Sequence, residues 1–202
     1  MSDHLLLVLC PPLVRRLHRL APGIELQVQQ ITPEIAKHLA LRRVDLSIQP
    51  TNLVRGADNQ TLYQDSWVCA VWRGNDAVQS TITREQLGTL PHVSFASTRT
   101  PLAEQLIAPH LGKKPVVQVT TQSFVPLAFL LRETQMIALI PRSLATHVQA
   151  MADIRVLELP IPTLPLVFDM SWNPLYTTDA AHTWLRGVIA EVAQTSDLTS
   201  RG

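Results

Sequence analysis

Short strand patterns alternate with amphipathic helix patterns along almost the whole chain. An early helix pattern ends at an Ala-Pro-Gly turn at residues 21–23, and a run of alternating apolar and polar residues follows from Ile24 to Ile31. Such pairs recur as far as a last helix pattern near residues 179–193. This alternation is typical of an α/β fold in which helices connect largely parallel strands. It argues against all-helical and all-β architectures.

Both end helices have an apolar face. The first carries Leu13, Val14, Leu17 and Leu20 on one face. The sequence leaves two possible starts for this helix, because Pro11 and Pro12 lack an N–H group. The helix either begins at Pro11 or runs from Leu5 with a kink. The last helix is expected to bury one apolar stripe, formed by Trp184, Leu185, Val188, Ile189 and Val192. Three polar residues are expected to lie away from this stripe: His182, Arg186 and Glu191.

Composition limits the classes of protein to which the chain can belong. Of 202 residues, 46% are hydrophobic and 16% charged, which indicates a folded chain long enough for one mid-sized domain or two lobes. The net charge of +1 comes without a basic stripe for nucleic acid. No apolar run is long enough to span a membrane, and no export leader is visible, so we expect a cytoplasmic protein. Cys10 and Cys69 are expected to be buried thiols in a reducing compartment.

Motifs for catalysis or cofactor binding are missing from the sequence. It contains no Gly-rich phosphate loop, no Gly-x-Ser-x-Gly and no His-Glu-x-x-His, and only 7 glycines. No two of its 7 histidines stand at a metal-binding spacing beside a carboxylate. We therefore predict no catalytic residues, no cofactor and no metal.

Small hydroxyl residues occur instead at the turns between strands and helices. In an open parallel sheet, such turns line a crevice at the carboxyl ends of the strands, where helix N-termini offer N–H donors to an anion. The alternative is that each hydroxyl only caps its own helix. The turns are Ser2-Asp3, Thr51-Asn52, Ser97-Thr98-Thr100 and Thr120-Thr121-Ser123.

The order of several short motifs resembles the effector-binding domain of LysR-type transcriptional regulators over nearly the whole chain. The end of the chain, from Trp172 through Asp179, resembles a sub-group that senses nitroaromatics, salicylate or plant flavonoids. The motifs are Met1-Ser2-Asp3, Pro11-Pro12-Leu13, Ala21-Pro22-Gly23-Ile24, Val44-Asp45-Leu46-Ser47-Ile48, Ile137-Ala138-Leu139-Ile140-Pro141 and Trp184-Leu185-Arg186.

The resemblance implies an α/β fold of two Rossmann-like lobes joined by two crossover strands, as in periplasmic binding proteins of type 2. Lobe I would comprise residues 1–72 plus 168–202, and lobe II residues 73–167. The family's N-terminal winged helix-turn-helix is absent from this chain. The resemblance also implies a homodimer, or a tetramer in the full-length protein. In that dimer the first helix and the Ile24–Ile31 strand would meet the Ser123–Leu131 helix of the partner.

Matching motifs suggest which residues line an effector cleft between the lobes. Ser2, Asp3 and His4 would stand at the start of the first helix, and Trp172 and Asn173 near the hinge. His92 could equally be a hydrogen-bonded structural histidine, and Trp172 a core residue. The other predicted ligand-binding residues are Ser97, Thr98, Thr100, Ser123 and Phe124.

These observations favour a sensor of a small, aromatic or anionic effector that controls DNA binding through the missing domain, without membrane attachment. A solute-binding receptor with the same two-lobed shape is the alternative, and an export signal would distinguish it. An enzyme on this scaffold is the third hypothesis, although no pairing of nucleophile and base supports it.

Overall fold

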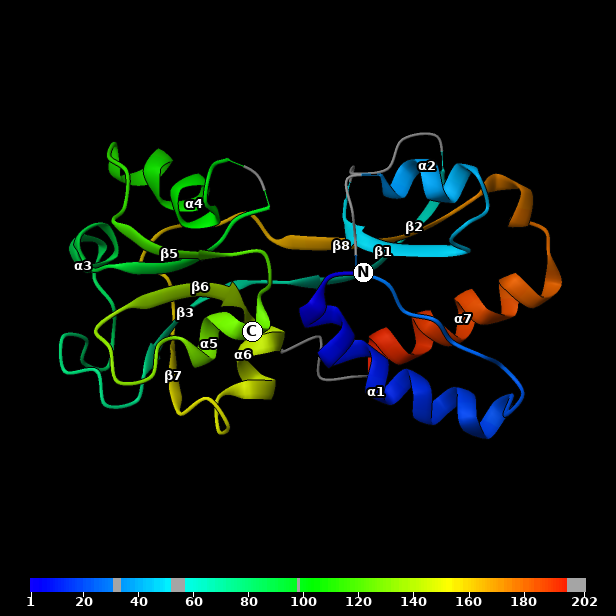
Figure 1. Ribbon diagram of the computed structural model, residues 1–202, viewed down its shortest axis with the longest axis horizontal. Coiled ribbons are helices and arrows are strands. Elements are labelled where there is room, and N and C mark those ends of the chain that lie inside the picture. The colour runs from blue at the N-terminus through cyan, green and yellow to red at the C-terminus, as the bar shows by residue number, and fades with distance from the viewer. Residues whose placement is uncertain (31–33, 52–56, 98, 196–202) are drawn as a thin grey trace. The chain divides into compact units, whose positions relative to one another are not determined.

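The computed structural model describes residues 1–30, 34–51, 57–97 and 99–195. The chain forms two compact units, shown in Figure 1. Unit 1 comprises residues 1–65 and 166–202, and unit 2 comprises residues 66–165. The chain therefore leaves unit 1 after Asp65 and returns to it at Leu166. Among the described residues, no helix is long and apolar enough to cross a membrane.

Unit 1 is built around a three-stranded antiparallel sheet with the strand order β1-β8-β2. One face of the sheet packs against the helices α1 and α7, which also pack against each other. The elements are α1 (Asp3–Leu20), α2 (Ile35–Ala40), β1 (Leu46–Pro50), β2 (Asp58–Asp65), β8 (Leu166–Trp172), a 3-10 turn η1 (Pro174–Tyr176) and α7 (Ala180–Thr195).

Unit 2 has a five-stranded mixed sheet with the order β5-β4-β6-β3-β7. β4 is parallel to β5 and to β6, whereas β3 is antiparallel to β6 and β7. The elements are β3 (Trp67–Trp72), α3 (Arg84–Thr89), β4 (His92–Phe95), α4 (Leu102–Leu111), β5 (Val117–Thr121), α5 (Val125–Phe129), β6 (Ile137–Pro141), α6 (Arg142–Val148) and β7 (Ile154–Leu157).

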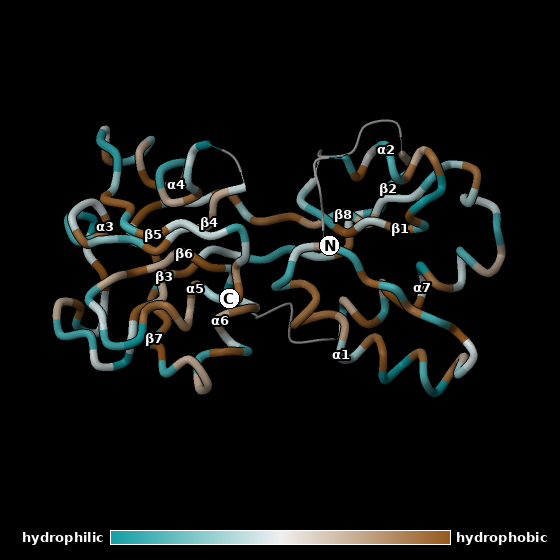
Figure 2. Tube along the Cα trace, in the orientation of Figure 1, coloured by the Kyte–Doolittle hydropathy of each residue, from teal (hydrophilic) through white to brown (hydrophobic). Residues whose placement is uncertain are grey.

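The cores of the units differ in their sheets. In unit 2, every residue of β6 is buried, and apolar colour covers β3 and β6 in Figure 2. In unit 1, the apolar face of the sheet bears Ile48, Phe168 and Met170, which pack with α1 and α7. Strands that are buried on both faces read as continuous apolar runs, which is why β6 was easy to predict from the sequence.

The sheets correct two expectations. They are not largely parallel: only the β5-β4-β6 part is, because the chain reverses direction at β3 and at β8. The boundaries of the units also fall earlier than residues 72 and 167. β3 belongs to unit 2 because its hydrogen bonds go to β6 and β7, and β8 belongs to unit 1 from its first residue.

The expected strand over residues 24–31 is absent: residues 24–30 form no regular element, and residue 31 lies outside the described residues. An alternating pattern becomes a strand only where a neighbouring strand takes up its hydrogen bonds. The first helix resolves the alternative left open by the sequence, since α1 begins at Asp3 and continues through Pro11 and Pro12. Leu13 and Leu17 are buried as expected, but Val14 and Leu20 are exposed.

The prediction for the last helix was right for Val188, Ile189 and Val192, which are buried, but wrong for three other residues. His182 and Arg186 are buried, whereas Trp184 is 40% exposed. The Arg186 guanidinium donates to the carbonyl oxygens of Tyr176 and Thr177, and it lies 4.3 Å from the centre of the Trp172 ring. A buried arginine with its donors satisfied can occupy a place that hydrophobic periodicity assigns to the surface.

Candidate functional site

At the carboxyl end of β1, the start of α1 meets aromatic side chains. Pro50 pairs with Phe168 of β8, whose ring stacks on Tyr63 at a centroid distance of 4.9 Å. The His4 ring lies 5.4 Å from the same Phe168 ring, and Ser2 Oγ lies 3.0 Å from His4 Nδ1. The structure therefore places Ser2 and His4, at the start of α1, beside the aromatic side chains at this end of the sheet.

Ser2, the polar residue before the helix, does not behave as a simple cap. Ser2 is the N-cap residue of α1, yet its side chain makes no capping hydrogen bond and contacts His4 instead. Burial lowers the pKa of His4 to about 4, although the nearby Asp3 carboxylate opposes the shift. His4 is therefore neutral at neutral pH and can act as a hydrogen-bonding group without charge.

Sequence reasoning missed Gln49, the residue before Pro50. Its side chain is 2% exposed, and neither of its amide atoms has a hydrogen-bond partner among the described residues. It shares a face of the sheet with Ser47, Asp169 and Ser171, which are also buried. A buried polar group without a partner is costly and therefore rare, so Gln49 is a candidate binding residue. The signal in the sequence was a glutamine that directly precedes the proline at the end of the strand.

In unit 2, aromatic side chains gather at the carboxyl ends of the parallel strands. Phe95, the last residue of β4, stacks on Phe124, with ring centres 4.1 Å apart and planes 9° from parallel. Trp67 lies 6.1 Å from Phe124. Of these three, only Phe124 was predicted; Phe95 was detectable as an aromatic residue that ends a strand just before a hydroxyl-rich turn.

The hydroxyl turns of unit 2 begin at the same end of the sheet. Ser97 and Thr100 are exposed on the loop that follows β4, while Thr98 lies outside the described residues. Ser123 follows β5 but does not cap α5, whose N-cap residue is Phe124. The backbone N–H of Ala103 donates to Ser94 Oγ, so α4 already has one internal partner for its N-terminal donors.

His92 stands apart from this group. It begins β4, whereas Phe95 ends it, and it pairs with Val117 and Ile137 at the starts of their strands. Its Nε2 donates to the carbonyl oxygen of Leu87 over 2.9 Å, and burial lowers its pKa although this hydrogen bond opposes the shift. The geometry is that of the structural histidine considered above, although no partner for Nδ1 is found among the described residues.

Trp172 and Asn173 are not near the hinge, so that expectation was wrong. Because β1 and β8 are antiparallel, Trp172 pairs with Leu46 at the amino end of β1, six residues along β8 from the point where the chain enters unit 1. Trp172 Nε1 donates to Thr177 Oγ1, and Asn173 Nδ2 donates to the carbonyl oxygen of Leu39. Their polar groups are occupied by bonds within unit 1.

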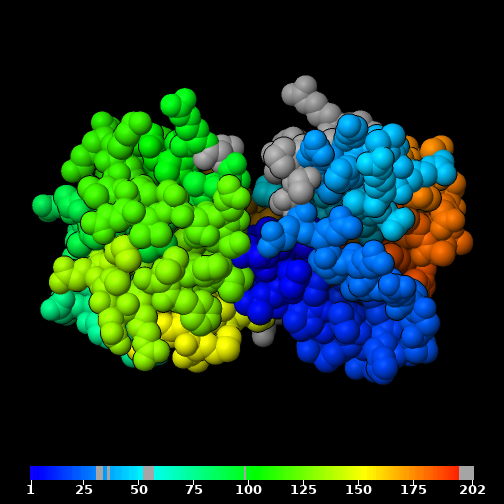
Figure 3. Space-filling model, viewed as in Figure 1, coloured from blue at the N-terminus to red at the C-terminus, as the bar shows by residue number. Residues whose placement is uncertain are grey.

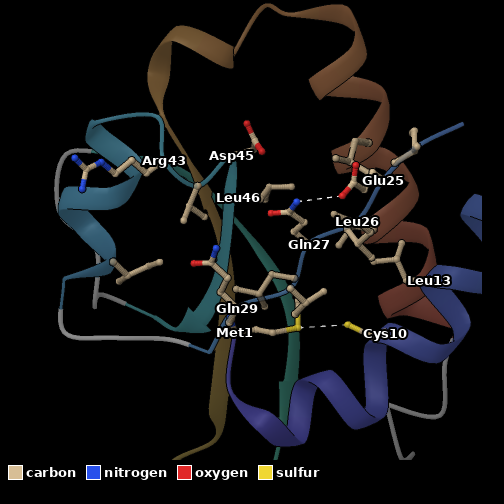
Figure 4. A pocket seen from close by; sticks show the side chains of 17 residues that line it. Met1, Cys10, Leu13, Glu25, Leu26, Gln27, Gln29, Arg43, Asp45 and Leu46 are labelled. Carbon is tan, nitrogen blue, oxygen red and sulfur yellow. Dashed lines mark hydrogen bonds between the residues drawn. The ribbon is translucent and has the colours of Figure 1, made fainter.

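A cavity of about 340 Å³ lies elsewhere in unit 1 and includes none of the predicted site residues. Figure 4 shows it between β1 and the segment 24–29, with Met1 and Cys10 at one end. Both cysteines are buried and free, as predicted. Within the described ranges, no group of three or more histidine, cysteine, aspartate or glutamate residues could hold a metal ion.

Comparisons with known proteins agree on one family. The family model of the LysR substrate binding domain matches residues 1–194. Nodulation protein D 2 of Rhizobium tropici is 28% identical over 195 residues, which are 96% of this chain and 62% of that protein. The HTH-type transcriptional regulator SyrM of Rhizobium meliloti is 28% identical over 199 residues, with coverage of 97% and 61%. The chain thus spans less than two thirds of the length of these relatives.

Solved structures give the same result for the fold. The regulatory domain of MexT, a transcriptional activator in Pseudomonas aeruginosa, superposes with a TM-score of 0.82 at 25% identity, covering 95% of this chain and 94% of that one. The reduced regulatory domain of OxyR2 from Vibrio vulnificus has a TM-score of 0.76 at 16% identity, with coverage of 95% and 92%, and supports the fold alone. The chain belongs to the LysR substrate-binding domain family, the effector-binding domains of LysR-type transcriptional regulators.

Proposed function

We propose that this domain senses a small aromatic, anionic effector and reports its presence without transforming it. The observation that carries the proposal is the stacked pair Phe95 and Phe124, which lies where the hydroxyl turns of unit 2 begin. Aromatic faces favour an aromatic ligand, and hydroxyl groups orient its polar substituent. Ser97, Thr100 and Ser123 supply these hydroxyl groups, and Thr98 is proposed with them.

Unit 1, taken by itself, carries a second set of groups that suits a polar ligand. The start of α1, with Ser2, Asp3 and His4, adds a neutral imidazole and a helix N-terminus, which favours an anion such as a carboxylate. The Gln49 amide adds one donor and one acceptor that lack partners among the described residues. His92, Trp172 and Asn173 are assigned structural roles, because their contacts lie inside their own units.

Effector binding would act by shifting an equilibrium between arrangements of the two units. A change in transcription would require a DNA-binding domain in the whole protein. The protein would then act in the cytoplasm, the compartment that holds the bacterial chromosome. The relatives support this view, since SyrM is described as a transcriptional regulator of the HTH type.

Titration calorimetry against a panel of aromatic carboxylic acids tests the proposal. We expect saturable heat with at least one acid, and a loss of affinity of about tenfold or more in Phe124→Leu, which keeps apolar volume but removes the ring. Phe129→Leu is the matched control, because Phe129 lies on α5 but is 45% exposed and outside the stack. The proposal is rejected if no aromatic acid gives saturable heat while an unrelated class of metabolite binds.

We also propose that two copies of the domain associate. Unit 1 exposes Leu6, Val14 and Leu20 on α1, and unit 2 exposes Phe129 and Leu130 at the end of α5. These are the segments that the predicted antiparallel dimer would cover, and an isologous pair is the commonest oligomer. Analytical ultracentrifugation should give a dimer that Val14→Glu dissociates; a monomer at high concentration would exclude the arrangement.

A further inference from the structure

A second cavity of unit 1 lies between its two long helices. It has a volume of about 270 Å³ and is lined by the second half of α1 and by the end of α7. The two helices pack against each other and run side by side in Figure 1. In Figure 3, the blue atoms of α1 lie on the surface of unit 1. This α1–α7 pocket therefore belongs to one unit alone and lies within reach of a ligand from solvent.

Three arginines of α1 line the α1–α7 pocket: Arg15, Arg16 and Arg19. Arg19 follows the other two at spacings of four and three residues, which bring side chains of a helix onto the same face. The whole chain has a net charge of only +1, so three positive charges within five positions form a strong local concentration. Like charges at these spacings repel each other, and an anion bound between them would relieve the repulsion.

Only one of the three arginines has an anionic partner among the described residues. Arg16 Nη2 lies 3.1 Å from Glu191 Oε2 of α7. Arg15 and Arg19 make no hydrogen bond and no ion pair with any residue that the structure describes. They therefore do not serve the carbonyl oxygens at the helix ends, as arginines near a C-terminus often do. Three positive charges against one negative charge leave the lining with an excess of two positive charges.

The charge and size of the α1–α7 pocket suit a small oxyanion with two negative charges. A guanidinium group presents a planar fork of donors that matches the oxygen atoms of phosphate. A phosphate monoester carries about two negative charges at neutral pH, which equals the excess in the lining, whereas a single carboxylate carries one. Pockets for drug-sized ligands have volumes of about 300–1,000 Å³, so a cavity of about 270 Å³ fits a smaller molecule.

We propose that the α1–α7 pocket binds a phosphoryl group, either free phosphate or the phosphate of a small metabolite. Arg15 and Arg19 supply the unpaired guanidinium groups that hold it, and Glu191 fixes Arg16 at the edge of the pocket. The site is separate from the proposed effector site, because Arg15 lies about 16 Å along the helix axis from His4. The inference does not depend on effector binding.

A titration of the 202-residue chain followed by amide NMR shifts tests the proposal. The probes are inorganic phosphate, pyrophosphate and glycerol phosphate, at constant ionic strength. We expect saturable shifts in residues 13–19 and 191–195. Arg15→Gln combined with Arg19→Gln should weaken binding by about tenfold or more, because it removes both unpaired guanidinium groups. The tighter binder of phosphate and glycerol phosphate identifies the source of the phosphoryl group.

The matched control is Arg73→Gln combined with Arg132→Gln. It removes the same charge from exposed ion pairs of unit 2 and should leave the affinity unchanged. Glu191→Gln gives a test in the opposite direction, because Glu191 is the one carboxylate in the described lining. Its removal should tighten phosphate binding by about threefold or more, a gain that a misfolded variant cannot produce.

Three results would overturn the proposal. The first is the absence of saturable shifts with all three phosphate compounds. The second is an equal loss of affinity in the two double variants, which would indicate general attraction by charge. The third is tighter binding of succinate than of pyrophosphate, which would assign the pocket to carboxylates. Calorimetry with aromatic acids is a separate measurement, so failure of either proposal leaves the other standing.

Discussion

The two sheets of this protein bury different kinds of side chain. In unit 2, the central strands β3 and β6 are apolar along their length and buried on both faces. In unit 1, one face of the sheet is apolar, while the other buries Ser47, Gln49 and Asp169. An apolar sheet gains stability from burial, whereas buried polar groups cost stability unless they are paired. The comparison suggests that unit 2 is the more stable scaffold and that unit 1 retains hydrogen-bonding capacity.

Truncation of matched isoleucines should give the largest effect. Ile137→Ala in β6 should lower the free energy of unfolding by about 3–4 kcal/mol, because the closely packed surroundings cannot collapse onto the gap. Ile48→Ala in β1 should cost about 2 kcal/mol, since one side of Ile48 already borders a cavity. Urea denaturation of both variants gives the two values. Equal losses would contradict the difference between the units.

Acid should weaken unit 1 through His4. The folded pKa of His4 is lowered to about 4, so the unfolded chain takes up a proton at a higher pH than the folded chain does. The free energy of unfolding should therefore fall as the pH drops from about 6.5 toward 4, by about 1 kcal/mol per pH unit from this residue.

His92 should also lower the free energy of unfolding as the pH drops, in this case that of unit 2, because its pKa is also lowered by burial. His4→Gln should remove the contribution of His4 to the pH dependence of the free energy of unfolding and leave the contribution of His92. Denaturation curves between about pH 7 and pH 5 measure both slopes. A variant that keeps the full pH dependence would show that His4 is not the responsible group.

Replacement of the unpartnered glutamine should have the smallest effect on stability, with the opposite sign. Gln49→Leu should leave the free energy of unfolding unchanged or raise it by about 1 kcal/mol, because it removes two buried polar atoms that lack partners among the described residues. Gln64→Leu on the exposed part of β2 is the control. Marked destabilisation by Gln49→Leu would mean that its amide is satisfied in solution.

Two elements have strong local signals in the sequence. Thr83 caps α3 through a capping box with Gln86, as the Thr-x-x-Gln spacing indicates, and β6 follows from its continuous apolar run. The motifs that resemble the LysR family supplied the fold, which local patterns could not. The prediction of parallel strands was wrong where the chain reverses, at β3 and β8, because the direction of a strand depends on pairing partners that are distant in sequence.

The candidate site was predictable only in part. Hydroxyl residues mark the turns after β4 and β5 in the sequence, and the family resemblance suggested Phe124; their role in binding stays a prediction. Phe95 and Gln49 were missed: each had a weak signal in the sequence, but the ring stack of Phe95 and the missing partners of Gln49 are visible only in the coordinates. Trp172 and Asn173 were misplaced because strand order decides at which end of a sheet a residue lies.

The position of β8 in the middle of the sheet of unit 1 has a consequence for biosynthesis. Unit 2 is one continuous stretch of chain, so it can fold on the ribosome as soon as residue 165 has emerged. β1 and β2 meet only through β8, so the first 65 residues must wait for the last part of the polypeptide before their sheet can close. Residues 1–65 of the nascent chain therefore expose apolar surface until β8 has been synthesised, and chaperones that bind such surface should associate with this segment.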